Sequence, residues 1–333
     1  MTTLAAVIAL DRPAYLGLDR DPAFRAAVAR GMERYGVHYA GSRAAAYCPG
    51  VYAEAEAYLA RKIGVADVVL VGSGSLAAKL TTEALGAAGY DIIDRHDPAQ
   101  HHPAMHPCWP EATAIYDDRQ LGRVIAEAPP DRRLAVRRVT IDPLTLGTSS
   151  RVSEMWAPDA RVLDVADASH DLLLRPLTAL FVGQVFPHEV VVASLGKVLS
   201  IPAGVIAGPR AVTEVVRALP AFRGASPPPP AYAAAVLALG ERLLERQSRL
   251  NHVAAHVELA CAPLEAAGAV KTRGLSYPVI VVRDGALVAR LTSAGFVLSV
   301  IRYPAAESPL LHRIVLRADL RDEEVARLCA VLA

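Results

Sequence analysis

A lysine in an apolar segment is the first residue that points to chemistry. Lys197 lies in a run of Val, Ala, Leu and Ile at 190–201, and only four of the 35 basic residues in the chain are lysines. An unpaired ammonium group is costly to desolvate. A desolvated lysine loses basicity and becomes a nucleophile that forms an imine with a carbonyl cofactor. This interpretation competes with that of a lone surface lysine.

An acid and an imidazole follow another apolar run, thirty residues earlier. Asp167 comes directly after the strand-like segment 161–166, and His170 lies three residues further on. Open α/β sheets bind ligands at the carboxyl ends of their strands. A carboxylate there can pair with a protonated pyridine nitrogen, and His170 can bond a phenolic oxygen or assist proton transfer. Asp167 could instead cap the next element, and Asp164 is the competing acid, although its position within the strand favours a structural role.

A Gly/Ser turn at 72–75 separates a strand-like run from a helical one. Backbone N–H groups at a helix N-terminus favour a phosphate, so Ser73, Gly74, Ser75 and Leu76 predict a phosphate cradle. Ser194, three residues before Lys197, is a second hydroxyl donor. A turn of this composition is weak support by itself.

The His-rich segment 94–106 does not have the spacing of a metal site. Its prolines oppose the helix that would align ligands on one face, so we expect no metal. One histidine stacked on an aromatic cofactor is the preferred interpretation.

The segments between these residues alternate between strand and helix. Apolar runs of strand length span 67–71, 134–141, 161–166 and 189–194. Helical spacing spans 22–35, with Asp21 as N-cap, 52–63 and 76–85. Such alternation predicts a mostly parallel sheet with helices on both faces.

The proline run at 227–230 marks a boundary, and a long helical pattern at 231–260 is expected to bridge two domains. Beyond it, strands are expected at 277–283, 296–303 and 312–317, and helices at 285–294 and at 320–332 with Asp319 as N-cap. We therefore expect an N-terminal segment at 1–35 that is part of the small domain, a large domain at 36–235 and a small α+β domain at 236–333.

Composition limits the class of partner. The 333 residues are 53% hydrophobic with a net charge of +1, which favours a small-molecule substrate over nucleic acid or an anionic membrane. No run approaches the roughly 18 apolar residues of a membrane helix, and the N-terminus lacks the features of a signal peptide. The four cysteines show no paired spacing. We expect a soluble, cytoplasmic protein with reduced thiols.

In order along nearly the whole chain, these motifs resemble those of the α-oxoamine synthase family of fold-type-I pyridoxal-phosphate enzymes. Residues 194–197 are similar to its T-L-G-K, 167–170 to its D-D-S-H and 74–78 to its S-G-F-A-A-N turn. The resemblance implies pyridoxal 5'-phosphate as cofactor, with a Schiff base on Lys197 and Asp167 on the pyridine nitrogen. It also implies that the turn and Ser194 hold the phosphate.

Further motifs imply the substrate contacts and the assembly. Residues 15–18 resemble the N-Y-L-G-L motif, and 41–43 the G-S-R motif, so Ser42 and Arg43 are expected to contact substrate. Arg313 matches the arginine that grips the substrate carboxylate, a bidentate task suited to guanidinium. Ser226 matches a hydroxyl that reaches the phosphate of the neighbouring subunit, which implies a homodimer with shared active sites.

The chain departs from the family pattern at three places. Ala14 replaces the Asn before Tyr-Leu-Gly, and Ala168 replaces the second acid of D-D-S-H. The stacking histidine lies in a rearranged segment, where we choose His102, with His96 and His101 as competitors.

The resemblance implies an aspartate-aminotransferase-like α/β fold: a mostly parallel seven-stranded sheet plus a smaller C-terminal α+β domain. It implies an amino-acid substrate whose Cα carbanion attacks an acyl thioester, from acyl-CoA or an acyl carrier, with loss of carbon dioxide in a biosynthetic pathway. An aminotransferase, decarboxylase, aldolase or lyase remains the alternative, because the same carbanion serves all of them. A non-catalytic relative of the fold is the third hypothesis.

Overall fold

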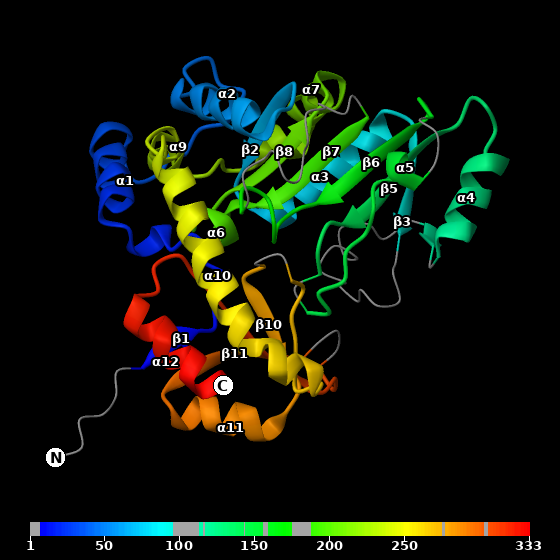
Figure 1. Ribbon diagram of the computed structural model, residues 1–333. Coiled ribbons are helices and arrows are strands. Elements are labelled where there is room, and N and C mark those ends of the chain that lie inside the picture. The colour runs from blue at the N-terminus through cyan, green and yellow to red at the C-terminus, as the bar shows by residue number, and fades with distance from the viewer. Residues whose placement is uncertain are drawn as a thin grey trace.

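The computed structural model describes residues 7–95, 113–115, 117–142, 144–155, 159–174, 188–274, 277–302 and 306–333. Within these residues the large sheet has seven strands. Its order is β2 (Asp67–Val71), β8 (Gly204–Gly208), β7 (Glu189–Ser194), β6 (Val162–Asp167), β5 (Arg133–Val139), β3 (Tyr90–Arg95) and β4 (Thr113–Ile115). Only β8 runs antiparallel to its neighbours among these strands. The expected α/β fold with a mostly parallel seven-stranded sheet is confirmed (Figure 1).

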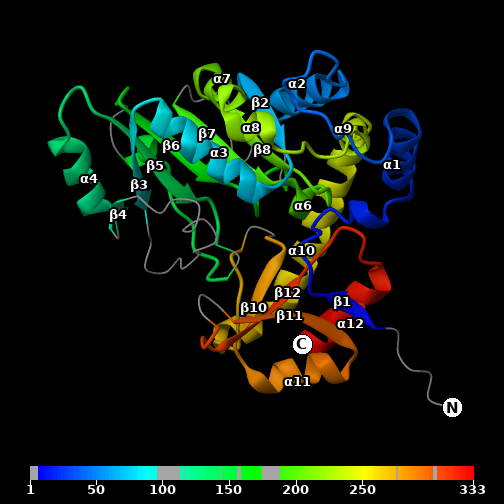
Figure 2. The same ribbon diagram turned by 180° about the vertical axis from the view of Figure 1, so that it is seen from behind.

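Both faces of this sheet are buried, which explains why its strands are continuously apolar. In β2, Val69 and Val71 pack with α3 (Gly74–Ala87) and α7 (Arg210–Ala218) on one face. Val68 and Leu70 pack on the other face with α2 (Val51–Ile63). Figure 2 shows α3 lying across the sheet.

The remaining helices are short or peripheral to this sheet. Helix α1 (Pro22–Tyr35) begins at Asp21, whose side chain accepts a hydrogen bond from the Phe24 amide, and it packs on α9 (Pro230–Leu237). The others are η1 (Leu18–Arg20), α4 (Asp118–Glu127), α5 (Val152–Met155), α6 (Leu195–Val198) and α8 (Pro220–Gly224). None of the described helices combines the length and apolarity that a membrane span requires.

The smaller sheet joins the two ends of the chain. Its order is β1 (Ile8–Leu10), β11 (Phe296–Arg302), β12 (Leu310–Val315), β10 (Val279–Val282) and β9 (Val270–Lys271). Helices α10 (Arg242–Ala266), α11 (Gly285–Ser293) and α12 (Asp322–Leu332) share its hydrophobic core. The parallel pairing of β1 with β11 holds the N-terminal segment against this sheet. The domain boundaries at 35/36 and 235/236 stay a prediction.

Two local expectations were wrong. The single helix expected at 231–260 is two helices, α9 and α10, and between them Gly240 adopts a φ of 47°, a left-handed conformation that ends a helix. Asp319 does not cap the last helix. Its carboxylate lies 2.8 Å from Arg317 Nε, and Arg321 is the N-cap of α12.

Candidate active site

The carboxyl ends of β6 and β7 bring together the residues singled out in the sequence. Asp167 is the last residue of β6, and Lys197 lies in α6, which follows β7 directly. The two strands are parallel neighbours, with Asp167 opposite Val192. The Ser194 amide donates to Ser169 Oγ at 3.0 Å, which fixes the turn after one strand to the end of the other.

Lys197 and His170 are in direct contact. Lys197 Nζ lies 2.6 Å from His170 Nε2, and the Tyr15 hydroxyl lies 2.8 Å from His170 Nδ1. Both Tyr15 and His170 are buried. Sequence reasoning missed Tyr15 as a site residue, although the motif at 15–18 was the signal that could have found it.

The surroundings of Lys197 favour its free amine. Burial lowers the pKa of this ammonium group, the Asp167 carboxylate opposes that shift, and the Arg313 guanidinium reinforces it. Arg313 comes from β12 of the smaller sheet, where it donates to Ser299 Oγ at 2.8 Å. The structure therefore places a buried guanidinium and a buried amine in one site, although more than 100 residues separate them.

The predicted phosphate turn lies against the same site. Ser73 caps α3, and its side chain accepts a hydrogen bond from the Leu76 amide at 3.1 Å. A Cβ at Gly74 would lie 2.7 Å from Ser194 Cβ, so only glycine allows the turn to approach the strand that precedes Lys197. Ser73 and Ser75 are exposed at the surface of this turn.

We expect Gly74→Ala to destabilise the protein by about 1–3 kcal/mol, because the added methyl group meets the Ser194 Cβ and Cα within 3 Å. Gly86→Ala, in the same helix, is the matched control: nothing lies within 4 Å of its added Cβ, and alanine favours the helix by about 0.5–1 kcal/mol. Thermal or urea unfolding measures both. Equal stability of the two variants would contradict the close approach.

Three further predicted residues lie apart from this contact network. Arg43 forms an ion pair with Glu56 at 2.8 Å, and its guanidinium stacks 4.5 Å from the Tyr52 ring centroid. Ser42 Oγ donates to the Arg223 carbonyl at 2.6 Å. The backbone of Ser226 lies against Gly72, and its side chain is exposed. These contacts tie Ser42 and Arg43 to the large sheet and its flanking helix.

The predicted stacking residue, His102, lies outside the described residues, as do His96 and His101.

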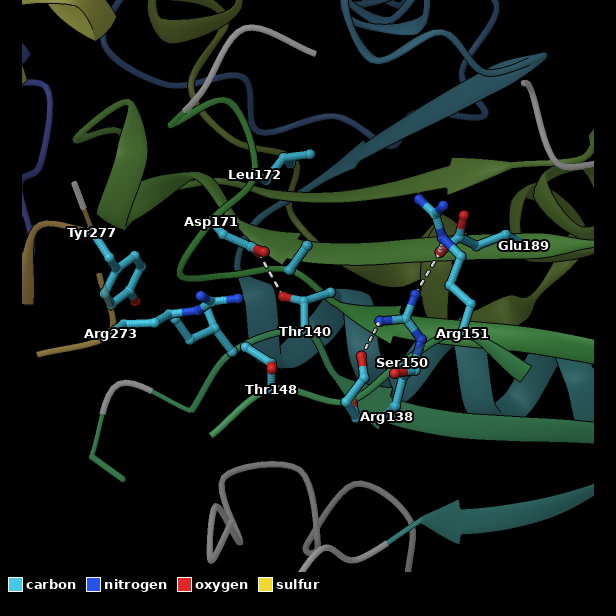
Figure 3. Close-up of a pocket in the computed structure, with 13 residues that line it drawn as sticks. Arg138, Thr140, Thr148, Ser150, Arg151, Asp171, Leu172, Glu189, Arg273 and Tyr277 are labelled. Atoms are coloured by element: carbon cyan, nitrogen blue, oxygen red, sulfur yellow. Dashed lines mark hydrogen bonds and ion pairs between the residues drawn. The ribbon is translucent and has the colours of Figure 1, made fainter. Parts of the chain in front are cut away.

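A cavity of about 300 Å³ lies next to the site and is lined in part by Ala168 and Asp171, which are close to His170 in the chain. Figure 3 shows Thr140 bonded to Asp171 at its centre, with Arg273 and Tyr277 beside them. At its far end Arg138 bonds both carboxylate oxygens of Asp164 at 3.0 Å. This pairing gives Asp164 the structural role that its position within the strand predicted.

Solved structures share this fold over nearly the whole chain. A serine palmitoyltransferase of Sphingomonas wittichii matches with a TM-score of 0.79 at 19% identity, covering 98% of this chain and 86% of that chain. An 8-amino-7-oxononanoate synthase of Francisella tularensis matches with a TM-score of 0.71 at 16% identity, covering 98% and 97%. The fold is that of the fold-type-I pyridoxal-phosphate enzymes, as predicted.

A sequence relative narrows the class. The 8-amino-7-oxononanoate synthase of Methylobacterium nodulans is 30% identical over 329 residues, which are 96% of this chain and 84% of that protein. The chain belongs to the α-oxoamine synthase family, which confirms the resemblance drawn from its motifs. No family model matches it.

Proposed function

We propose that this protein is a pyridoxal-phosphate-dependent acyltransferase that joins an amino acid to an acyl thioester with loss of carbon dioxide. The observation that carries the proposal is the position of Lys197, which contacts His170 at 2.6 Å and follows the strand next to Asp167, with Arg313 near enough to lower the pKa of its ammonium group. These residues combine a nucleophilic amine, a carboxylate and a carboxylate-binding guanidinium in one buried site.

The residues present fit pyridoxal phosphate. The turn at Ser73, Gly74, Ser75 and Leu76 would hold the phosphate, and the space that a Cβ at Gly74 would fill is closed by Ser194. Ser194 would add its hydroxyl to the phosphate, and Ser226 would reach the phosphate of a second subunit. Backbone N–H groups and the helix N-terminus favour the phosphate directly.

Residues at the carboxyl ends of β6 and β7 would hold the ring of the cofactor. Asp167 would pair with the pyridine nitrogen, His170 would bond the phenolic oxygen, and His102 would stack on the ring. When bound, pyridoxal phosphate supplies an electron sink that stabilises a carbanion at Cα of an amino acid.

The residues of this chain then have separate tasks. Lys197 would hold the cofactor covalently and afterwards move the proton at the substrate Cα, which its lowered pKa suits. Arg313 would bind and orient the substrate carboxylate. Ser42 and Arg43 would contact the substrate through a rearrangement of their present bonds or from a neighbouring subunit. A homodimer with shared active sites and a cytoplasmic location complete the proposal.

The test supplies a panel of amino acids with and without acyl-CoA. Release of free thiol and carbon dioxide that requires both substrates would support the proposal. Transfer of the amino group to a 2-oxo acid, without thiol release, would assign an aminotransferase instead. Absence of any amino-acid-dependent change in the visible spectrum of the loaded protein would favour a non-catalytic relative.

The pH dependence of imine formation follows from the burial of Lys197. The protonated amine is not nucleophilic, so a lowered pKa makes Lys197 reactive at lower pH than a lysine of ordinary pKa, 10.5. We expect the reaction of the apoprotein with a small uncharged aldehyde to rise with pH through a midpoint below that value. The difference from Lys197→Ala isolates this residue.

Asp167→Asn tests the direction in which the neighbouring carboxylate shifts the pKa of Lys197. The Asp167 carboxylate raises the pKa of Lys197, so its neutralisation should move the midpoint further down. An upward shift would contradict the electrostatic account.

A further inference from the structure

A chain of hydrogen-bonding groups leads from the cavity to Lys197. The Tyr277 hydroxyl, at the wall of the cavity, lies beside Tyr15 and donates to the His170 carbonyl at 3.4 Å. Tyr15 bonds His170 Nδ1 at 2.8 Å, and His170 Nε2 lies 2.6 Å from Lys197 Nζ. Four side chains from distant parts of the sequence therefore form one line of contacts.

The backbone holds Tyr15 firmly in this line. Its amide donates to the Lys197 carbonyl at 3.2 Å, and its own carbonyl accepts from the Ala318 amide at 2.8 Å. Tyr15 is thus tied to the active-site turn on one side and to the segment after β12 on the other. Its hydroxyl has a defined position relative to the imidazole.

The phenols at this end of the chain keep their protons. Burial is the largest cause that raises the pKa of Tyr15 and of Tyr277. A phenol that keeps its proton can donate it to an imidazole nitrogen. Which nitrogen of a histidine carries the ring proton is set by the hydrogen bond that the other nitrogen makes.

We propose that Tyr15, supported by Tyr277, is a positioning residue that holds His170 in the tautomer protonated at Nε2. Tyr15 donates to His170 Nδ1, and His170 Nε2–H points to Lys197 Nζ. The ring therefore presents an N–H donor to the reaction centre. This inference deepens the proposed function and rests on it, because the same N–H is what a bond from His170 to the phenolic oxygen of the cofactor requires.

The opposite direction of donation is less favourable on two grounds. It needs Lys197 as the first donor, and burial disfavours its ammonium form while a neutral amine is a weaker donor than a phenol. It also makes the Tyr15 oxygen the acceptor of an imidazole N–H, whereas a phenol is a better donor than acceptor.

The experiment is nitrogen NMR of the apoprotein labelled with ¹⁵N-histidine, with His170→Gln used to assign the signal. Couplings between ring nitrogens and ring protons report which nitrogen carries the proton. We expect a single Nε2–H tautomer for His170 at neutral pH. An Nδ1–H tautomer in the wild type would overturn the proposal.

Two variants separate positioning from general stability. Tyr15→Phe removes the donor to Nδ1 and should convert the single tautomer to a mixture. Tyr52→Phe is the matched control, because Tyr52 is also buried and also loses one hydrogen bond, from its hydroxyl to the Pro228 carbonyl at 2.7 Å. A pure Nε2–H tautomer in Tyr15→Phe would also overturn the proposal.

Activity gives an independent readout that distinguishes this inference from the proposed function. In the loaded enzyme, Tyr15→Phe should lower kcat about tenfold, the factor that one net hydrogen bond supplies, with KM unchanged. Wild-type protein without thiol release but with the Nε2–H tautomer would refute the proposed reaction alone. Thiol release with the Nδ1–H tautomer would refute the role of Tyr15 alone.

Discussion

Lys197→Ala is expected to remove the covalent attachment of pyridoxal phosphate and to lower turnover by about a thousandfold or more, because one side chain supplies both the amine and the base. Borohydride should reduce the imine that gives the loaded wild type its visible absorption band, and it should leave a stable adduct on the protein. The variant should bind the cofactor only reversibly, and borohydride should leave no adduct on the protein.

Lys79→Ala is the matched control for this prediction. Lys79 is exposed on α3, close in sequence to the phosphate turn, so the change removes a lysine without touching the buried amine. Unchanged borohydride trapping in Lys197→Ala, or its loss in Lys79→Ala, would move the attachment site elsewhere.

Asp167→Asn is expected to lower turnover by about 10²- to 10³-fold, the loss typical when one preorganised electrostatic partner is removed. The amide cannot keep a pyridine nitrogen protonated, so the cofactor loses its power as an electron sink. The free energy of unfolding of the variant should change by no more than about 1 kcal/mol, because Asn can still accept the hydrogen bond that the Ser169 amide donates at 3.0 Å. Steady-state kinetics and urea unfolding measure the two effects.

Asp164→Asn should show the reverse pattern. Asp164 lies on the same strand but pairs with the buried Arg138, so its neutralisation leaves Glu189, at 2.8 Å, as the remaining buried carboxylate partner of that guanidinium. We expect a stability loss of about 1–3 kcal/mol with much of the specific activity of the folded fraction retained. If Asp164→Asn lost turnover and Asp167→Asn lost stability, the roles of the two acids would have to be exchanged.

The local features of this chain were readable from sequence because they depend on neighbouring residues. Apolar runs predicted β2, β6 and β7, since strands of a sheet that is covered on both faces need no polar alternation. Helical spacing and Asp21 predicted the start of α1. The placement of Lys197 and Asp167 at the ends of adjacent strands followed from the same pattern.

Local sequence patterns gave a wrong prediction at two places, the helix at 231–260 and the N-cap Asp319. The helix expected at 231–260 is broken near Gly240. Many helices tolerate a single glycine, and the left-handed φ of this one depends on packing, so the sequence did not predict the break. Asp319 is a good N-cap by residue type, yet it pairs with Arg317. The partner that a polar side chain selects is decided by what lies nearest in space.

The sequence by itself determined strands β2, β5, β6 and β7 of the large sheet, but not β3, β4 or β8, and it determined the candidate chemistry of Lys197, Asp167 and His170. Only the tertiary structure decided that β1 pairs with β11, that Arg313 reaches the site from the smaller sheet and that Tyr15 and Tyr277 line up behind His170. The physical reason is the distance along the chain that separates the interacting residues. Backbone conformation responds to residues a few positions away, whereas these contacts join segments more than 100 residues apart and exist only in the folded chain.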